Sequence, residues 1–273
     1  MGMATVNGLE THYQWMQARD RSRPVPTVVC VHGLGYDSLA SFYLTLASPV
    51  SSAGIDVLTY DLRGHGRSVR PPTGYRLADF VDDLEALLDE LGVHHPVHLV
   101  GNSFGGTIAF SFAAKYPDRV ASIVSIEAEP ATEPWSDKMG RTFRNTIEAM
   151  GDDRYLGWVG ETFGSHYVRL TKAAATVIRS TTLVEEVALG PLLDADGLAA
   201  ISCPVLSILG SDGFQSDDLH AVQSSLPDCR TEVIDGQNHS VLVERHPTVR
   251  TMLLSWIAEH ETARFAFAED GAA

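Results

Sequence analysis

The chain has 273 residues, of which 44% are hydrophobic and 20% are charged. This length and composition exclude a disordered chain and a disulfide-stabilised miniprotein, and they predict one large α/β domain with room for an insertion. The 20 Lys and Arg residues stand against 35 Asp and Glu residues, so the net charge of -15 would repel the phosphates of nucleic acids and of acidic membranes.

Three cysteines, Cys30, Cys203 and Cys229, show no CxxC spacing, and two of them lie in apolar runs. We interpret them as reduced residues in or near the core, which favours neither a disulfide framework nor a metal site. The N-terminus lacks the basic start and apolar stretch of a signal peptide, and no run reaches the ~18 apolar residues of a membrane span. A cytoplasmic protein that binds neither membrane nor nucleic acid is expected.

Short apolar runs rich in β-branched residues, bounded by Gly, Pro or Asp, predict six strands that are buried on both faces of a parallel sheet. They are Thr27–Val31, Ile55–Tyr60, Val97–Val100, Ala121–Ile126, Pro204–Leu209 and Thr231–Ile234. Between them, Leu77–Leu91 has apolar residues at helical spacing and ends at Gly92. A mostly parallel sheet is therefore predicted, with ligands at the carboxyl ends of its strands.

The alternation of strand and helix stops between about residues 131 and 200, where helical patterns follow one another. They are Trp135–Met150, Arg154–Phe163, Tyr167–Thr181 and Leu183–Leu193. Their combined length favours a helical cap, residues 131–200, inserted into a core made of residues 1–130 and 201–273. A plain stack of crossover helices is the alternative.

The segment Gly101-Asn102-Ser103-Phe104-Gly105-Gly106 follows a predicted strand and opens a predicted helix. Small residues two before and two after Ser103 allow a tight turn that holds the serine in strained backbone above the sheet. The amides of the helix start then face an incoming oxyanion. The alternative is a glycine-rich helix start that packs on the sheet or binds phosphate.

A second glycine turn, with His32, Gly33, Leu34 and Gly35, follows an earlier strand. Here the amide of Leu34 would point at the space above Ser103 and, with the amide of Phe104, could hold a tetrahedral oxyanion. We interpret His32 as a brace for this loop rather than as a base.

A serine needs an activating base, and His239 is the best candidate because it follows the last predicted strand, at the same sheet edge as Ser103. A carboxylate must orient the imidazole. Two residues at strand ends qualify: Glu127 in VSIEAEP and Asp212 in LSILGSDGF. Asp212 has an alternative role as a turn residue, whereas a carboxylate directly after a buried run, as at Glu127, needs a partner.

Together, HGLG, DLRGHGRS, GNSFGG and the late NHS resemble the α/β-hydrolase superfamily, over the chain from about Val6 to Ala258. The resemblance implies a mostly parallel, eight-stranded sheet flanked by helices, with an inserted helical cap and no cofactor. It also implies Ser103 as nucleophile, His239 as general base and then acid, and the amides of Leu34 and Phe104 as the oxyanion hole. DLRGHGRS is chiefly structural in this family.

Similar hydrolases usually carry the acid as an aspartate three residues after the glycine that ends the penultimate strand. That position is Gly213 in this chain, and Asp212 comes one residue early. A subset of similar enzymes uses a glutamate after the sixth strand, which IEAEP resembles. The resemblance thus favours Glu127 as the acid, with Asp212 as the alternative.

The expected function is a serine hydrolase that cleaves a carboxylic ester, lactone or thioester of a small apolar or aromatic substrate through an acyl-enzyme. Serine at the turn argues against the similar haloalkane dehalogenases and epoxide hydrolases, which use a carboxylate nucleophile. The first alternative is a carbon–carbon bond hydrolase of ring-cleavage products, whose turns often read GNSxGG but which usually carry an aromatic residue where Ser240 stands. The second is a non-catalytic small-ligand receptor on the same fold.

The cap is expected to determine specificity, with Trp135, Met139 and Trp158 lining an apolar substrate pocket. Basic residues of the cap, Lys138 among them, are candidates to meet a carboxylate or phosphopantetheine, although solvated helix faces explain them equally well. The expected partner is a small-molecule substrate, and the chain is expected to be a monomer or a homodimer.

Overall fold

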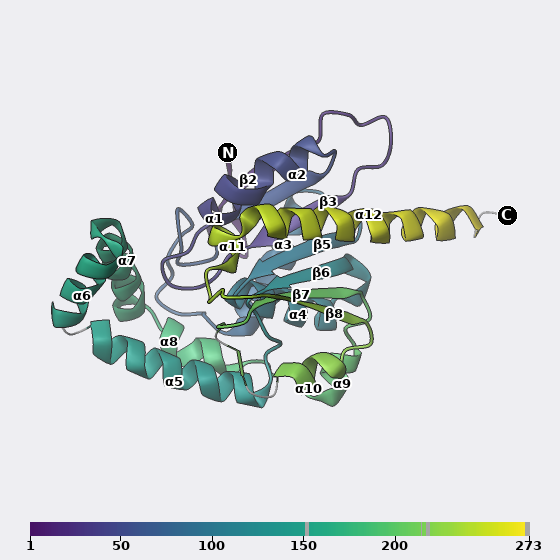
Figure 1. Ribbon diagram of the computed structural model, residues 1–273. Coiled ribbons are helices and arrows are strands. Elements are labelled where there is room, and N and C mark those ends of the chain that lie inside the picture. Colours follow the sequence, from purple (N-terminus) through teal and green to yellow (C-terminus); the bar gives the residue numbers. More distant parts are fainter. Residues whose placement is uncertain (151–152, 214, 217–218, 271–273) are drawn as a thin grey trace.

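The computed structural model, which describes residues 1–150, 153–213, 215–216 and 219–270, has an eight-stranded sheet at its centre (Figure 1). The strand order is β1-β2-β4-β3-β5-β6-β7-β8; β2 runs antiparallel to both of its neighbours, β1 and β4, and all other neighbouring strands are parallel. The strands are β1 (Gly2–Val6), β2 (Leu9–Met16), β3 (Thr27–Val31), β4 (Asp56–Tyr60), β5 (Val97–Asn102), β6 (Val120–Ile126), β7 (Val205–Gly210) and β8 (Cys229–Ile234).

The six strands predicted from apolar runs are confirmed, with ends that differ by two residues or fewer. The expected burial on both faces is wrong for β8, an edge strand whose side chains are mostly exposed. The same runs did not reveal β1 and β2, which form an antiparallel hairpin. Asn7 and Gly8 join them with positive φ angles of 50° and 78°. Asn-Gly is the residue pair that favours such a turn, so this dipeptide was the signal for the hairpin.

Helices cover both faces of the sheet, and strand side chains alternate between the two cores. Val29 and Val31 of β3 join the core under α3 (Leu77–Glu90) and α4 (Phe104–Lys115). Val28 and Cys30 join the opposite core, under α1 (Ala40–Phe42), η1 (Tyr43–Ala47), α2 (Ser48–Ser52), α11 (Val241–Glu244) and α12 (His246–Asp270). The short η2 (Pro117–Arg119) and α10 (Leu219–Ser224) complete the connections around the sheet. Within the described residues, no helix combines the length and the hydropathy needed to cross a membrane.

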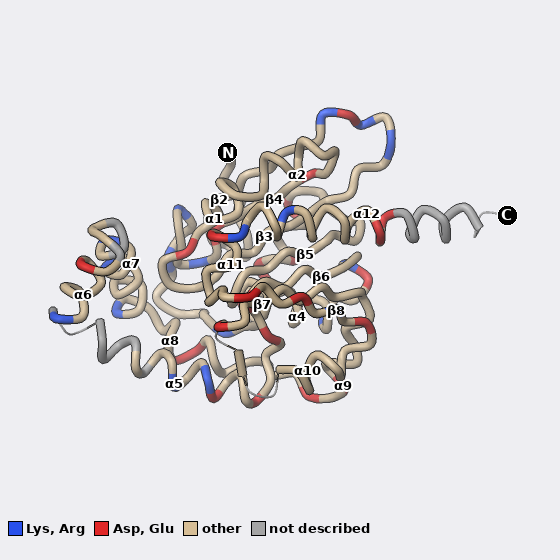
Figure 2. The backbone as a smooth tube through the Cα atoms, in the orientation of Figure 1, with Lys and Arg blue, Asp and Glu red and all other residues tan. Residues whose placement is uncertain are grey.

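A run of helices lies between β6 and β7: α5 (Glu133–Met150), α6 (Asp153–Phe163), α7 (Ser165–Ser180), α8 (Leu183–Glu186), η3 (Val187–Leu189) and α9 (Ala195–Ala199). In Figure 1 and in Figure 2, α6 and α7 stand away from the sheet, and α5 runs from below the sheet toward them. The helix expected over Leu183–Leu193 is wrong in its second half. Gly190 has a φ of 90° and is followed by Pro191, so the helix ends there.

The three cysteines are free: Cys30 and Cys203 are buried, and Cys229 is half-buried. Burial raises the pKa of the Cys203 thiol to about 12 and raises the pKa of Cys30 as well. At neutral pH these two thiols are therefore protonated and unreactive.

The turn between β5 and α4 is packed backbone against backbone. A Cβ atom on Gly105 would lie 1.9 Å from the carbonyl oxygen of Val31, and one on Gly101 would lie 2.4 Å from the carbonyl oxygen of Gly105. Neither position can hold a side chain without moving α4 away from β3 and β5. The glycines around Ser103 therefore fix how deeply the turn sits in the sheet.

Replacing Gly105 with Ala should lower the free energy of unfolding by about 2 to 3 kcal/mol, because backbone atoms must separate to admit the new methyl group. Urea unfolding followed by circular dichroism measures this change. Gly157→Ala is the matched control, since nothing lies within 4 Å of a Cβ at this helical position; it should be neutral or stabilising by about 0.5 to 1 kcal/mol. Equal stability of the two variants would contradict the packing argument.

Candidate active site

Two neighbouring strands end in strained residues that carry reactive side chains. In the parallel pair β5 and β6, Asn102 lies opposite Ile126, so the next residues, Ser103 and Glu127, leave the sheet side by side. Each has a φ of 53°, an arrangement that costs a non-glycine residue about 1 to 3 kcal/mol. The Ser103 N–H donates to the Ile126 carbonyl at 2.8 Å, and the Glu127 N–H donates to the Ile208 carbonyl at 2.9 Å. The sheet thus holds both residues in strained backbone at its carboxyl edge.

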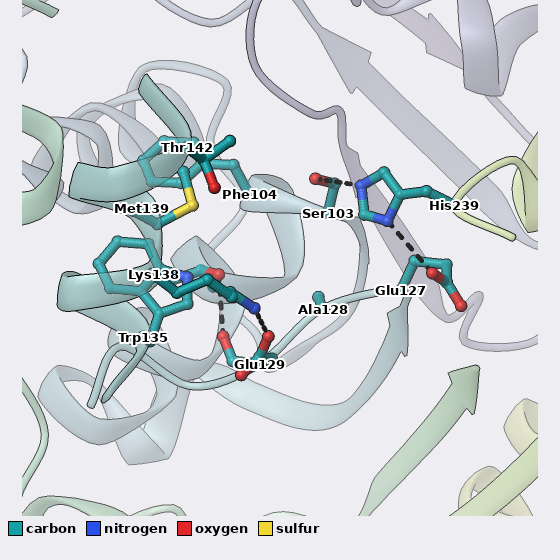
Figure 3. A pocket seen from close by; sticks show the side chains of 11 residues that line it. Ser103, Phe104, Glu127, Ala128, Glu129, Trp135, Lys138, Met139, Thr142 and His239 are labelled. Carbon is teal, nitrogen blue, oxygen red and sulfur yellow. Dashed lines mark hydrogen bonds and ion pairs between the residues drawn. The ribbon is translucent and has the colours of Figure 1, made fainter. Parts of the chain in front are cut away.

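His239 bridges these two residues from the loop between β8 and α11 (Figure 3). Its Nε2 lies 2.9 Å from Ser103 Oγ, and its Nδ1 lies 3.1 Å from Glu127 Oε2. Because an ionised carboxylate only accepts, Nδ1 carries the hydrogen and Nε2 is left to accept from the serine hydroxyl. The imidazole is 43% exposed and the Glu127 carboxylate is fully buried. The three side chains form one continuous hydrogen-bonded chain that begins at the surface.

The carboxylate of Glu127 has further donors. The Gly210 N–H and the Gln215 amide both donate to Oε1, the amide at 3.1 Å, while His239 bonds Oε2. These donors offset the cost of burying an ionised carboxylate. The structure therefore places the Glu127 carboxylate beside the imidazole, where donors from β7 and from the segment after β7 hold it.

The alternative acid, Asp212, lies elsewhere. Its side chain is exposed on the turn after β7, where Oδ1 accepts a hydrogen bond from Ser211 Oγ at 3.3 Å. A Cβ on the next residue, Gly213, would lie 2.7 Å from Glu127 Oε2 and 2.1 Å from Gln215 Nε2. The space beside position 213, where similar hydrolases carry an aspartate, is here filled by Glu127 and its amide donor.

The loop that carries Leu34 is held against the serine by two buried histidines. The Leu62 N–H donates to His32 Nε2 at 3.0 Å, and the Gly35 N–H donates to His65 Nε2 at 3.0 Å. Both rings therefore carry their hydrogen on Nδ1, which donates to the carbonyls of Gly33 and Arg63 respectively. His32 thus has the bracing contacts expected from the sequence, and His65 extends the same brace.

The loop that carries Leu34 and the start of α4 at Phe104, whose amides are expected to meet an oxyanion, both adjoin Ser103. Gly33 is close enough that a Cβ there would lie 3.3 Å from Ser103 Cβ, and its N–H donates to Asp37 Oδ2 at 2.8 Å. The Gly33 carbonyl, bound by His32, and the Gly35 amide, bound by His65, fix the peptide planes on both sides of Leu34. Phe104 begins α4, where first-turn amides have no acceptor within the helix.

A cavity of about 210 Å³ opens beside Ser103 and His239. Trp135 and Met139, on α5, line it as expected, and the Trp135 ring stacks on Phe104 with centroids 6.4 Å apart. Trp158 does not line it: α6 packs on α7, and this indole is 52% exposed beside Tyr155. The complete lining is Ser103, Phe104, Thr107, Glu127, Ala128, Glu129, Trp135, Lys138, Met139, Thr142 and His239.

The sequence analysis missed Glu129 as a lining residue, although it stands in the same IEAEP segment as Glu127. Its carboxylate is buried and forms an ion pair with Lys138 of α5. The signal was available, because a second carboxylate only three residues after a buried strand needs a partner as much as the first. Lys138 itself stands next to Met139 and three residues after Trp135, which places it on the pocket side of the same helix.

Protonation of His65 should make the fold sensitive to acid. Burial, and secondarily the charge of His32, lowers the pKa of His65 from 6.5 to about 4. Between pH 6.5 and pH 4 the unfolded chain binds a proton at this residue and the folded chain does not. The contribution of His65 to the free energy of unfolding is therefore fully present above about pH 6.5 and is lost as the pH falls toward 4. The loss should reach about 3 kcal/mol.

Urea unfolding at pH 7 and pH 4.5 measures this effect. His65→Gln, whose amide oxygen can still accept from Gly35 but binds no proton, should lose much less stability between the two pH values than the unaltered protein. An equal loss in both proteins would show that His65 does not take up the proton.

Residues 26–156 match the protein family described as the alpha/beta hydrolase fold. A proline iminopeptidase of Lactobacillus helveticus is 25% identical over 95% of this chain and 98% of its own length. A crystal structure of a putative lipase from Acinetobacter baumannii superposes with a TM-score of 0.79, at 16% identity over 96% of this chain and 92% of its own. The enol-lactonase of Burkholderia xenovorans gives a TM-score of 0.70, at 21% identity over 94% of this chain and all of its own. The structural matches establish the fold, and the named relatives are hydrolases of different bonds.

Proposed function

Because this chain belongs to the α/β-hydrolase superfamily, we propose that it is a serine hydrolase that cleaves a carboxylic ester, lactone or thioester of a small substrate. The observation that carries the proposal is the hydrogen-bonded chain from Ser103 through His239 to Glu127, with the serine in strained backbone at the opening of a cavity. This is the geometry of a nucleophile, its base and the group that orients the base.

In the proposed reaction, Ser103 Oγ attacks the substrate carbonyl carbon as its proton passes to His239 Nε2. Glu127 stays ionised and stabilises the imidazolium. The amides of Leu34 and Phe104 donate to the oxyanion of the tetrahedral intermediate. When the intermediate collapses, His239 returns the proton to the departing alcohol or thiol. A water molecule, deprotonated by His239, then attacks the acyl-enzyme; His239 gives this proton to Ser103 Oγ as the acyl–oxygen bond breaks, and the acid is released.

The cavity supports a small acyl group. Its volume of about 210 Å³ is below the roughly 300 to 1,000 Å³ of pockets for drug-sized ligands. The indole of Trp135, which stacks on Phe104, and the side chain of Met139 give it an apolar wall. Short aliphatic or aromatic acyl groups are the substrates that this wall accommodates.

Amide cleavage and carbon–carbon cleavage are the competing reactions on the same residues. Amide cleavage is tested because one relative of this chain is a proline iminopeptidase. An aminoacyl arylamide and a ring-cleavage product, assayed beside matched esters, separate the three reactions. Faster turnover of either competitor would contradict the ester assignment while leaving the nucleophile in place.

Ser103→Ala should abolish labelling by a fluorophosphonate probe, because only a serine activated by a base reacts quickly with it. Intact mass spectrometry measures the adduct. The unaltered protein should gain one probe mass and the variant none, with the same far-UV circular dichroism spectrum for both. Full ester hydrolysis by the variant, or an unlabelled wild-type protein, would overturn the proposed nucleophile and favour a receptor on this fold.

Glu127→Gln and Asp212→Asn should differ sharply. The first removes the charge that stabilises the imidazolium, so the acylation rate should fall by about 10³- to 10⁴-fold. The second alters an exposed turn residue, so the rate should stay within about threefold. Stopped-flow acylation by a chromogenic ester measures both, and equal rates for the two variants would mean that Glu127 is not the acid.

A further inference from the structure

The cavity beside Ser103 has a charged end. Glu129, in the segment after β6, and Lys138, on α5, form an ion pair in its wall, with side chains only 7% and 14% exposed. Figure 3 shows the pair on the opposite side of Ala128 from His239 and Glu127. A molecule that places a carbonyl at Ser103 and extends along the cavity would reach this pair.

Glu129 is held in place independently of Lys138. Its Oε1 accepts from the Ser216 N–H at 3.1 Å, and its carbonyl oxygen accepts from Thr107 Oγ1 at 2.8 Å. These donors come from α4 and from the segment after β7. Lys138 instead carries its ammonium on a flexible four-carbon stem, with N–H donors that can turn toward a ligand.

An ion pair in a cavity wall is expensive if its role is only structural. Removing two charges from water costs several kcal/mol for each ion, and apolar side chains of similar volume often serve the fold as well or better. The same charges next to a reactive serine are useful if a ligand completes their coordination. This points to substrate recognition.

The pair discriminates between ligand chemistries. An apolar group at the far end of the substrate would exclude water from both charges and offer them no hydrogen bond. A cationic end group would compete with Lys138 for Glu129 and be repelled by the ammonium. A carboxylate would accept from Lys138 while Glu129 keeps the Ser216 amide, so no charge is left without a partner.

We propose that Lys138 is a specificity-determining residue that binds a carboxylate at the far end of a short acyl chain. This inference rests on the proposed function, because it needs the ester carbonyl at Ser103. The substrate class is then the hemiesters of short dicarboxylic acids, or lactones whose ring carries a carboxylate.

The test compares kcat/KM for monophenyl glutarate and phenyl pentanoate, which have acyl chains of equal length but differ in the terminal carboxylate. The unaltered protein should prefer the hemiester by about tenfold or more, the value of one charge-assisted hydrogen bond. Lys138→Met should lose this preference. Because that change leaves Glu129 buried without its cation, Lys138→Met with Glu129→Gln is measured beside it and should lose the preference too. Lys172→Met, at an exposed position on α7, is the charge-matched control and should keep it.

Fluorophosphonate labelling is followed in every variant. A labelled wild-type protein without preference for the hemiester, or a double variant that keeps the preference, overturns the role of Lys138. A wild-type protein that neither reacts with the probe nor hydrolyses either ester overturns the proposed function, and this inference with it.

Discussion

The close approach of the β5–α4 turn to β3 is the constraint on which the site depends. Gly105 lies so near the Val31 carbonyl that no side chain fits between them, and this contact fixes the first turn of α4. Ser103 is then forced into left-handed backbone, which raises its hydroxyl above the sheet. Glu127, the residue after β6, has the same positive φ as Ser103. Because β5 and β6 end side by side, the distance between Ser103 and Glu127 is one that a single imidazole can span.

The carboxylate beside His239 comes from the residue after β6, although the segment after β7 lies against it as well. A buried carboxylate beside the imidazole requires hydrogen-bond donors, whichever strand it follows. The Gly210 amide and the Gln215 side chain provide them, and Gly213 leaves the necessary volume. The end of β7 and the segment after it therefore supply the hydrogen-bond donors for a carboxylate that follows β6.

The sequence predicted what depends on local chemistry. Buried runs located six strands, and the glycines around Ser103 located the turn, because both follow from short-range sterics and burial. The choice between Glu127 and Asp212 stayed open to residue-level reasoning, since it depends on which strands pair and on a space at Gly213 that only the folded chain creates. Trp158 does not line the pocket, because α6 packs on α7 and leaves this residue 52% exposed; an aromatic residue on a helix does not by itself indicate that it is buried or where it points. Glu129 was missed although the argument that favoured Glu127, a carboxylate after a buried strand in need of a partner, applies to it as well.

The helices between β6 and β7 begin within a few residues of Glu127 and return to the neighbouring strand of the sheet. Their two ends are thus anchored side by side, and the length of chain between them can change without shifting any strand. Glu129 and its ion pair with Lys138 lie across this junction, because Glu129 belongs to the segment that follows β6 and Lys138 belongs to α5. A replacement of α5 would therefore change the cavity wall at Trp135, Lys138 and Met139, while the backbone that carries Ser103 and Glu127 stays anchored in the sheet.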